Sequence, residues 1–296
     1  MSVNSFISKA LRQSLILNII SQSVPSKEDV DSVIELTASK VVDDLKALSM
    51  TLYLVEEKEI VFKFVYFSPI LWANNASLEQ KFEDKKQKLL ALRLPLETGL
   101  VGEVIATGES NFFCLDEDGP EKMLDLSKNT EFAVTSMLTV ALKSDCRIIG
   151  AIQVLNKEPA SDGSPRAFTR ANLMCLEEVG GYTSALLLRM LDSNYKINEE
   201  DAARYISNYT DTPLVTDESD LSFDKTLLAR VGADIIRTTN VLPYKLTSKN
   251  HVAVLMKNPL DITNREAFSL KTSLSIDEVW VASASLMDTL IKRYCH

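Results

Sequence analysis

Residues 136–157 read SMLTVALKSDCRIIGAIQVLNK, and this pattern predicts two antiparallel β-strands joined by a tight turn. Residues 136–143 and 147–155 are mostly apolar, with several β-branched side chains, whereas Ser144–Cys146 has the composition of a turn. Further along, residues 169–191 predict a long helix that opens after a phenylalanine. A hairpin followed by a long helix is typical of a layered domain in which the helix covers the sheet.

Upstream of this hairpin the sequence predicts a second one, formed by residues 50–56 and 59–68. Residues 72–92 are rich in charged side chains, so we expect a solvated helix at the edge of the sheet. A short helix follows, for which Thr98 can act as the N-cap. Gly108 can end this helix in a left-handed conformation.

The polar stretch Asp192–Asp201 predicts a domain boundary. We therefore expect an N-terminal amphipathic helix over residues 1–24, one domain over residues 25–192 and a second over residues 200–296. The elements predicted in the second domain are helices at 202–209 and 225–231, strands at 241–246, 251–257 and 278–282, and two further helices capped at Thr263–Glu266 and Ser285–Asp288. The expected fold class is mixed α/β (α+β), with a central antiparallel sheet flanked by helices in the first domain and a small α/β second domain.

The composition is that of an ordinary globular protein, since the 296 residues are 46% hydrophobic and 25% charged. The net charge of −9 disfavours non-specific binding to nucleic acid or to an anionic membrane. Four widely spaced cysteines and two histidines predict reduced thiols, no metal site and no cofactor. The apolar run Leu15–Ile20 is too short to span a membrane, and we expect a cytoplasmic protein.

Three segments of the first domain carry family motifs. They are GLVGEVIATGE at 99–109, KNTEFAVTSMLTVAL at 128–142 and GAIQVLNK at 150–157. Together they resemble the GAF domain, a module that dimerises or senses small molecules. In its phosphodiesterase-like branch the motif continues from Asn-Lys to Phe and then to Asp-Glu.

This chain keeps Asn156, Lys157 and Phe168 of that motif, but Asn172-Leu173 stands in place of Asp-Glu. The family's lysine–aspartate ion pair is therefore lost, which weakens the case for cyclic-nucleotide binding. A structural role of Phe168 is favoured over a ligand contact, because Phe168 and Leu173 flank the predicted cap Thr169 as a hydrophobic staple does.

If a ligand binds, the resemblance implies a pocket beneath the helix at 99–108 and the segment at 114–132, with the strand at 136–142 as its floor. The implied contact residues are Asp116, Thr130, Ser136 and Leu138, with Tyr66 and Phe64 as a wall. Alternate strand residues can equally be core. Cys114 is the only nearby thiol and no histidine precedes His251, so we expect no chromophore or haem.

The second domain carries DAARYISNYTDTPLV at 201–215, VLPY at 241–244, VAVLMKNPLD at 252–261 and IKRY at 291–294. This set resembles the N-terminal domain of type II secretion and type IV pilus assembly ATPases, which implies docking to an inner-membrane platform. The R-L-G repeat through which some members bind cyclic di-GMP does not occur in the sequence. Neither does the phosphate-binding motif G-x-x-x-x-G-K-(S/T).

The sequence thus predicts a protein that is not an enzyme, has no catalytic residues and forms a homodimer through the N-terminal helix and the helix after the GAF sheet. We expect its partner to be a protein of a pilus, secretion or motility machine. The alternative function is a cyclic-nucleotide sensor for cAMP, cGMP or cyclic di-GMP. A hydrolase is a third class, because carboxylate pairs such as Asp116 and Asp118 are not settled by spacing alone.

Overall fold

A computed structural model describes residues 15–16, 27–114, 134–144, 147–164, 166–192 and 197–295. The chain divides into two compact units, Met1–Tyr195 and Lys196–His296, which are described separately below. Of the predicted N-terminal helix, only Leu15 and Ile16 lie among the described residues, and both are helical and buried.

The N-terminal unit is built on one antiparallel sheet of six strands in the order β3-β2-β1-β6-β5-β4. Its strands are β1 (Ala47–Glu56), β2 (Glu59–Phe67), β3 (Arg93–Pro95), β4 (Asn111–Cys114), β5 (Ser136–Ser144) and β6 (Arg147–Lys157). Both predicted hairpins are present as β1–β2 and β5–β6, and the predicted fold class is confirmed.

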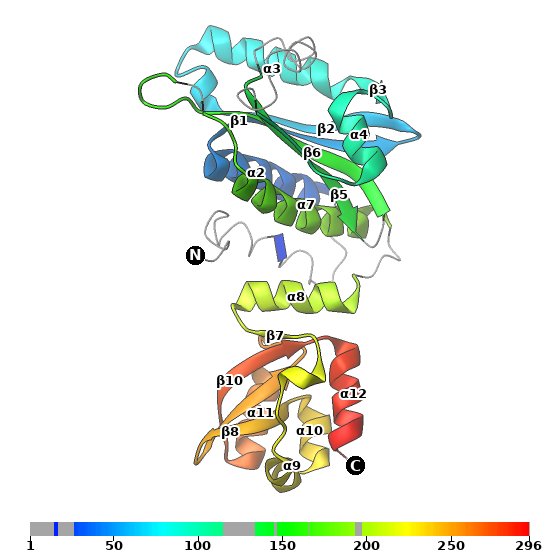
Figure 1. Cartoon of the computed structure of the whole chain (residues 1–296), viewed down its shortest axis with the longest axis vertical. Coiled ribbons are helices and arrows are strands. Elements are labelled where there is room, and N and C mark those ends of the chain that lie inside the picture. Colours follow the sequence, from blue (N-terminus) through cyan, green and yellow to red (C-terminus); the bar gives the residue numbers. More distant parts are fainter. Residues whose placement is uncertain are drawn as a thin grey trace. The chain divides into compact units, whose positions relative to one another are not determined.

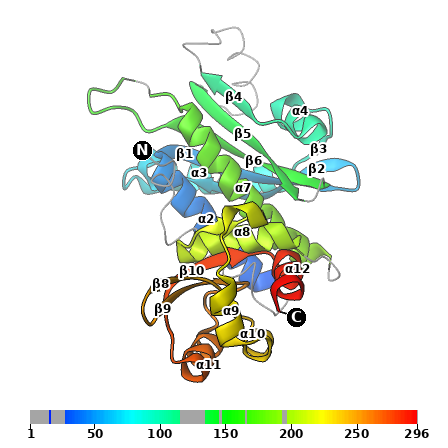
Figure 2. The same ribbon diagram turned by 60° about the horizontal axis from the view of Figure 1, so that its bottom comes forward.

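Helices cover both faces of this sheet. They are α2 (Lys27–Leu45), the short 3-10 helix η2 (Pro69–Leu71), α3 (Ala76–Leu90), α4 (Gly99–Thr107) and α7 (Arg170–Leu191). Figures 1 and 2 show α2 and α7 on one face, and Figure 1 shows α3 and α4 on the other. No residue of α3 is buried, as expected for a solvated helix.

Three helix ends in this unit test the predicted caps. Gly108 ends α4 with a left-handed φ of 71°, as predicted. Thr98 precedes α4, but its side chain makes no capping hydrogen bond, so only its position was predicted correctly. Thr169 caps α7 and accepts a hydrogen bond from the backbone N–H of Asn172, which closes a capping box.

The C-terminal unit has a mixed sheet of four strands in the order β7-β10-β9-β8. Its strands are β7 (Leu214–Val215), β8 (Leu242–Ser248), β9 (His251–Met256) and β10 (Ser275–Ala282). β10 is parallel to both of its neighbours, whereas β8 and β9 form an antiparallel hairpin.

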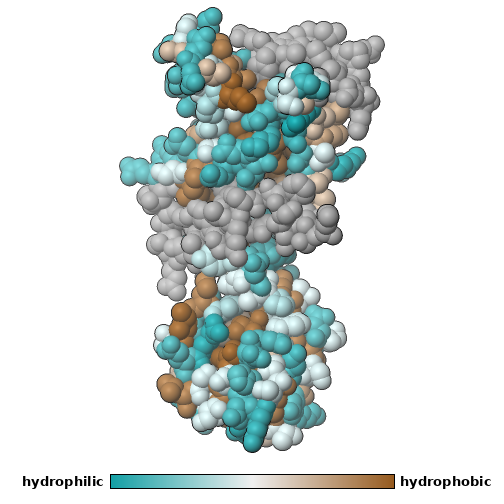
Figure 3. All heavy atoms as spheres, turned by 90° about the vertical axis from the view of Figure 1, so that its left-hand side faces the viewer, coloured by the Kyte–Doolittle hydropathy of each residue, from teal (hydrophilic) through white to brown (hydrophobic). Residues whose placement is uncertain are grey.

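Six helices accompany this sheet among the described residues of the unit. They are α8 (Glu199–Thr210), the 3-10 helix η3 (Glu218–Asp220), α9 (Lys225–Val231), α10 (Ala233–Thr239), α11 (Ile262–Thr272) and α12 (Ala284–Tyr294). Phe268 of α11 and Met287 of α12 share one buried core with Val254 of β9. The space-filling view also shows apolar side chains on the surface of this unit (Figure 3).

Two predicted caps in this unit are wrong by two residues. Asp261, not Thr263, caps α11 by accepting a hydrogen bond from the backbone N–H of Asn264. Ser283, not Ser285, caps α12 through the backbone N–H of Leu286. In both cases several adjacent residues can cap, and the observed cap lies two residues before the predicted one.

Candidate functional site

The motif residue Asn156 ties the end of β6 to the start of β5. Its backbone is left-handed, with φ of 51°, a conformation that asparagine tolerates better than most residues. Its side-chain Oδ1 accepts hydrogen bonds from the backbone N–H groups of Thr135, at 2.7 Å, and of Ser136, at 3.2 Å. Asn156 is buried, and its described hydrogen bonds fix the entry into β5.

Lys157 and Phe168 connect β6 to the start of α7. The Nζ of Lys157 donates to Oδ1 of Asn172 at 3.3 Å and lies 5.8 Å from the centroid of the Phe168 ring. Burial, and secondarily Arg166, lowers the pKa of Lys157. Phe168 and Leu173 are both buried, as the predicted hydrophobic staple requires. The motif residues are therefore engaged in holding the fold.

Ser136 and Leu138 lie on the opposite face of the sheet from the predicted pocket. Val140 marks this face, because a Cβ added at Gly180 of α7 would lie 3.2 Å from its side chain. Residues 136, 138 and 140 share one face, since side chains alternate along a strand. The prediction that Ser136 and Leu138 line a pocket beneath α4 is wrong by one strand position.

Tyr66 and Phe64 were placed on the wrong face for a different reason. The pairing of β2 with β1 shifts by one residue at Lys63, which is the extra residue of a β-bulge. Phe62 therefore packs in the cluster beneath α4, whereas Phe64 and Tyr66 lie on the other face. Tyr66 makes a side-chain hydrogen bond with Ser39 of α2, which confirms its orientation. Asp116 and Thr130, the other two predicted contacts, lie outside the described residues.

The face beneath α4 carries a buried polar network that the sequence reasoning missed. The hydroxyl of Tyr53 donates to Oε1 of Gln153 at 3.2 Å, and Nε2 of Gln153 donates to Oγ1 of Thr139 at 3.1 Å. Thr51 also forms a side-chain hydrogen bond with Tyr53. None of the four is more than 8% exposed.

This network runs straight across the centre of the sheet. Gln153 on β6 pairs in register with Thr51 on β1 and with Thr139 on β5. Burial raises the pKa of Tyr53, so its hydroxyl stays protonated and able to donate. The groups are neutral and hydrogen bond to one another, so the network does not transfer protons at neutral pH. In the sequence, this network could have been predicted only from Gln153, a single polar residue within the apolar run AIQVL.

The distinctive NPLD segment of the C-terminal unit forms the turn before α11. Asn258 Oδ1 accepts the backbone N–H of Leu260 at 3.0 Å, and the carbonyl of Asn258 accepts the N–H of Asp261 at 3.2 Å. Arg265 donates to the carbonyl of Pro259 at 3.3 Å, and Asp261 caps the helix. Its described contacts give this segment a structural role.

In the described part of the chain, no three His, Cys, Asp or Glu side chains gather in a way that could hold a metal ion. Among the helices that the structure describes, none has the length and apolarity needed to cross a bilayer.

Comparison with known families identifies residues 210–296 as an MshEN domain. This confirms the resemblance to the N-terminal domain of type II secretion ATPases. None of the curated proteins compared with the chain matches it.

GAF domains are among the solved structures that the chain resembles, as the sequence predicted. The GAF domain of an Acinetobacter phosphoenolpyruvate-protein phosphotransferase matches with a TM-score of 0.42 and 18% identity, over 67% of this chain and 100% of that one. The corresponding domain from Coxiella burnetii matches with a TM-score of 0.41 and 13% identity, over 63% and 98%. Free methionine-R-sulfoxide reductase from Neisseria meningitidis, solved with its substrate, matches with a TM-score of 0.40 and 17% identity, over 62% and 93%.

Proposed function

We propose that this chain is a non-enzymatic cytoplasmic adaptor whose C-terminal unit docks to a protein of a type IV pilus, type II secretion or motility machine. The observation that carries the proposal is the MshEN domain at residues 210–296, in a sequence that contains no phosphate-binding motif of an ATPase. Docking without nucleotide hydrolysis is the activity that such a domain can supply by itself.

The surface of the C-terminal unit supports this proposal. Leu260, Ile262 and Leu270 lie in or next to α11 and are 44%, 62% and 83% exposed. Exposed apolar side chains that gather on one element form the kind of surface that a protein partner can cover. Ile262 and Leu270 are two helical turns apart, so they lie on the same side of α11.

The test is a binding measurement between the full chain and purified cytoplasmic domains of pilus and secretion platform proteins. We expect Ile262→Glu and Leu270→Glu to weaken binding about tenfold each, because each places a charge in an apolar contact. Ile70→Glu changes an apolar residue of the N-terminal unit that is 51% exposed, and it is the control. Failure of every platform protein to bind the wild-type chain would refute the proposal.

We propose dimerisation as the role of the N-terminal unit. The apolar residues Leu173, Leu176 and Leu186 of α7 are buried within the chain, so a dimer cannot use them. Gly181 remains available, since a Cβ added there meets nothing within 4 Å. Close packing of two α7 helices at Gly181 would be blocked by Gly181→Leu, which light scattering can detect as a loss of dimer. A wild-type chain that is monomeric at high micromolar concentration would exclude this role.

A second candidate function is a cyclic-nucleotide sensor, and the Tyr53–Gln153–Thr139 network favours it. Its amide and hydroxyl groups lie on the sheet face beneath α4 and could hydrogen bond a purine or a ribose. Calorimetry with cAMP, cGMP and cyclic di-GMP tests this function. Binding to wild type that is lost in Gln153→Leu would establish the sensor, and no heat with any of the three would exclude it.

A further inference from the structure

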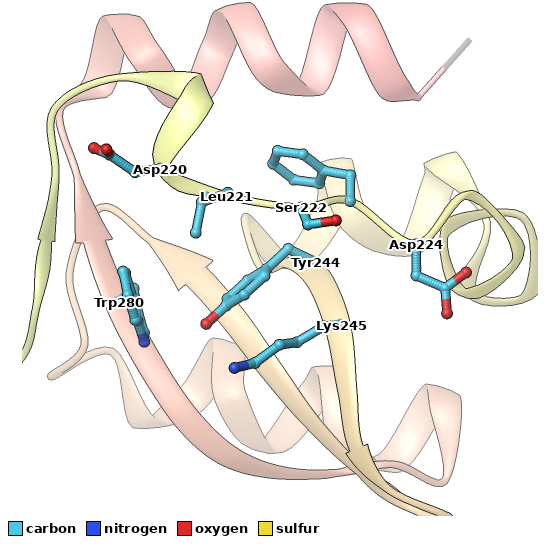
Figure 4. Close-up of a pocket in the computed structure, with 8 residues that line it drawn as sticks. Asp220, Leu221, Ser222, Asp224, Tyr244, Lys245 and Trp280 are labelled. Atoms are coloured by element: carbon cyan, nitrogen blue, oxygen red, sulfur yellow. The ribbon is translucent and has the colours of Figure 1, made fainter.

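A surface pocket of about 430 Å³ lies in the C-terminal unit, between the loop at 220–224 and strands β8 and β10 (Figure 4). We call it the Tyr244 pocket. It is lined by Tyr244 and Lys245 of β8, by Trp280 of β10 and by the loop residues Asp220, Leu221, Ser222, Phe223 and Asp224. Its volume is in the range of pockets that hold a small ligand or part of a partner chain.

The charged side chains leave the interior of this pocket neutral. Lys245 pairs with Glu278 at 3.3 Å, and its ammonium group lies over the ring of Tyr244, 5.6 Å from the ring centroid. Asp220 and Asp224 accept backbone hydrogen bonds, and Figure 4 shows their carboxylates directed to opposite sides, away from the pocket. A charged group that bound here would lose water without gaining a free counter-charge, so the pocket favours a neutral occupant.

Leu221 and Trp280 provide the apolar walls of the pocket. Both side chains are half-buried, and Figure 4 shows Leu221 pointing from the loop into the space between Trp280 and Tyr244. The rings of Trp280 and Tyr244 meet edge to face, with centroids 6.0 Å apart and an angle of 66° between the ring planes. Tyr244 is only 3% exposed, so it supports the indole from within and leaves the contact with a partner to Trp280 and Leu221.

The hydrogen-bonding groups that remain free in the pocket are donors. The indole N–H of Trp280 donates to no residue that the structure describes, and the ammonium group of Lys245 has donors left beyond its ion pair. The hydroxyl of Ser222 can donate as well. The acceptors of Tyr244 are not free, because its carbonyl accepts the N–H of Asp224 at 2.8 Å and its hydroxyl is buried. A segment that offers carbonyl groups but no N–H groups therefore matches this pocket.

We infer that the Tyr244 pocket receives a proline-rich segment of the partner protein, with one proline ring against Trp280 and Leu221. Proline is neutral and has no backbone N–H, so a run of prolines presents carbonyl acceptors and no donors. The carbonyl before the bound ring accepts the indole N–H of Trp280. Such segments are already extended when free, which lowers the entropic cost of docking against aromatic side chains. The inference rests on the proposed docking role of the C-terminal unit and names the chemistry of its contact.

The test titrates a blocked hexaproline peptide into the full chain carrying Trp72→Phe. Because the chain has two tryptophans, this variant leaves Trp280 as its only one. We expect hexaproline to change the Trp280 fluorescence saturably, with a dissociation constant on the order of 1 mM. Two blocked peptides of the same length are the controls. Hexasarcosine also lacks N–H groups but has no ring, and an alternating alanine–glycine peptide has N–H groups and no ring, so both should bind at least about tenfold more weakly.

Matched variants assign the binding to this pocket. Leu221→Glu puts a charge into the neutral pocket and should weaken hexaproline binding at least about tenfold. Leu246→Glu changes a leucine of β8 that is 40% exposed and does not line the pocket, and it should have no effect. Trp280→Phe keeps a flat ring without the indole N–H, and saturation-transfer NMR of the peptide should show a loss of about fivefold.

Trp280→Phe is conservative, so the test holds even where Leu221→Glu disturbs the loop. No saturable response to hexaproline, equal binding of either control peptide, or an unchanged affinity of Trp280→Phe would each overturn the inference.

These peptides do not depend on the identity of the partner. If the wild-type chain binds a platform protein and the Leu221→Glu and Trp280→Phe variants bind it equally well, docking stands and the proline pocket is wrong. If the peptides behave as expected and no platform protein binds, the proposed function is wrong and the pocket remains.

Discussion

Lys157 at the end of β6 donates a hydrogen bond to Oδ1 of Asn172 in the first turn of α7, at 3.3 Å. The same oxygen accepts the backbone N–H and the hydroxyl of Thr169, at 3.0 and 3.1 Å. An uncharged amide thus joins the end of β6 to the first turn of α7, so this contact is a hydrogen bond and not an ion pair.

Asn172→Asp should stabilise the N-terminal unit. Each described bond to the Asn172 side chain is accepted by Oδ1, so a carboxylate can replace the amide, and it gains attraction to Lys157 and to the helix N-terminus. We expect the free energy of unfolding to rise by about 1 kcal/mol, as measured by urea denaturation. Asn172→Ala, which removes all three bonds, should lower it by about 2 kcal/mol. Destabilisation by aspartate would show that the amide has a role of its own.

Asn156→Ala should destabilise the same unit by about 2 to 3 kcal/mol, because two backbone N–H groups at the entry to β5 lose their acceptor. Asn156→Asp keeps an oxygen in this position and is the control, for which we expect a loss of less than about 1 kcal/mol. Thermal unfolding of the full chain measures both. An alanine variant as stable as wild type would mean that Asn156 does not hold the fold.

Two glycines should respond in opposite ways to alanine. A Cβ at Gly150 would lie 1.9 Å from the carbonyl oxygen of Tyr53, which belongs to the backbone of a central strand and cannot move aside. Gly150→Ala should therefore cost about 3 kcal/mol or more. Within one chain a Cβ at Gly181 meets nothing within 4 Å, so Gly181→Ala should stabilise α7 of the monomer by about 1 kcal/mol. Equal effects of the two substitutions in denaturant unfolding would contradict the packing described.

Alkaline pH should weaken the C-terminal unit through Tyr244. Burial, with a smaller contribution from Glu278, raises the pKa of Tyr244 from 10.0 to about 12. Between these two values the unfolded chain has lost the proton and the folded chain has kept it, so the free energy of unfolding falls as the pH rises. Below the lower value this group causes no pH dependence. Tyr244→Phe should remove this component, and a stability profile unchanged by the substitution would show that Tyr244 is accessible to water.

Local patterns in the sequence predicted the hairpins, the long helix α7 and its cap Thr169, because each depends on residues close in the chain. The NPLD segment was identified as distinctive, although its role as the turn before α11 needed the structure. The helix α10 was missed because it begins directly after Gly232, which has a φ of 83°. In the sequence this glycine indicates the end of α9, but it does not indicate that a second helix follows at once.

The candidate site was harder to predict than the fold. To locate a pocket against the sheet, one must know which alternate residues of each strand face α4. The β-bulge at Lys63 reverses this alternation, so Phe64 and Tyr66 lie on the opposite face. On β5 an error of one residue led to the prediction that Ser136 and Leu138 face α4, whereas Thr139 does. The pocket around Tyr244 is lined by residues from a loop and from two strands that are not adjacent in the sheet. No spacing in the sequence therefore predicts it.

The most direct test of the central claim is hydrogen–deuterium exchange of the full chain with and without a bound platform protein. If the C-terminal unit is the docking half, protection should appear in α11 and in the strands β8 and β10 beside the Tyr244 pocket, while β1, β5 and β6 exchange as before. Protection confined to the N-terminal sheet, with the C-terminal unit unchanged, would contradict the proposed function.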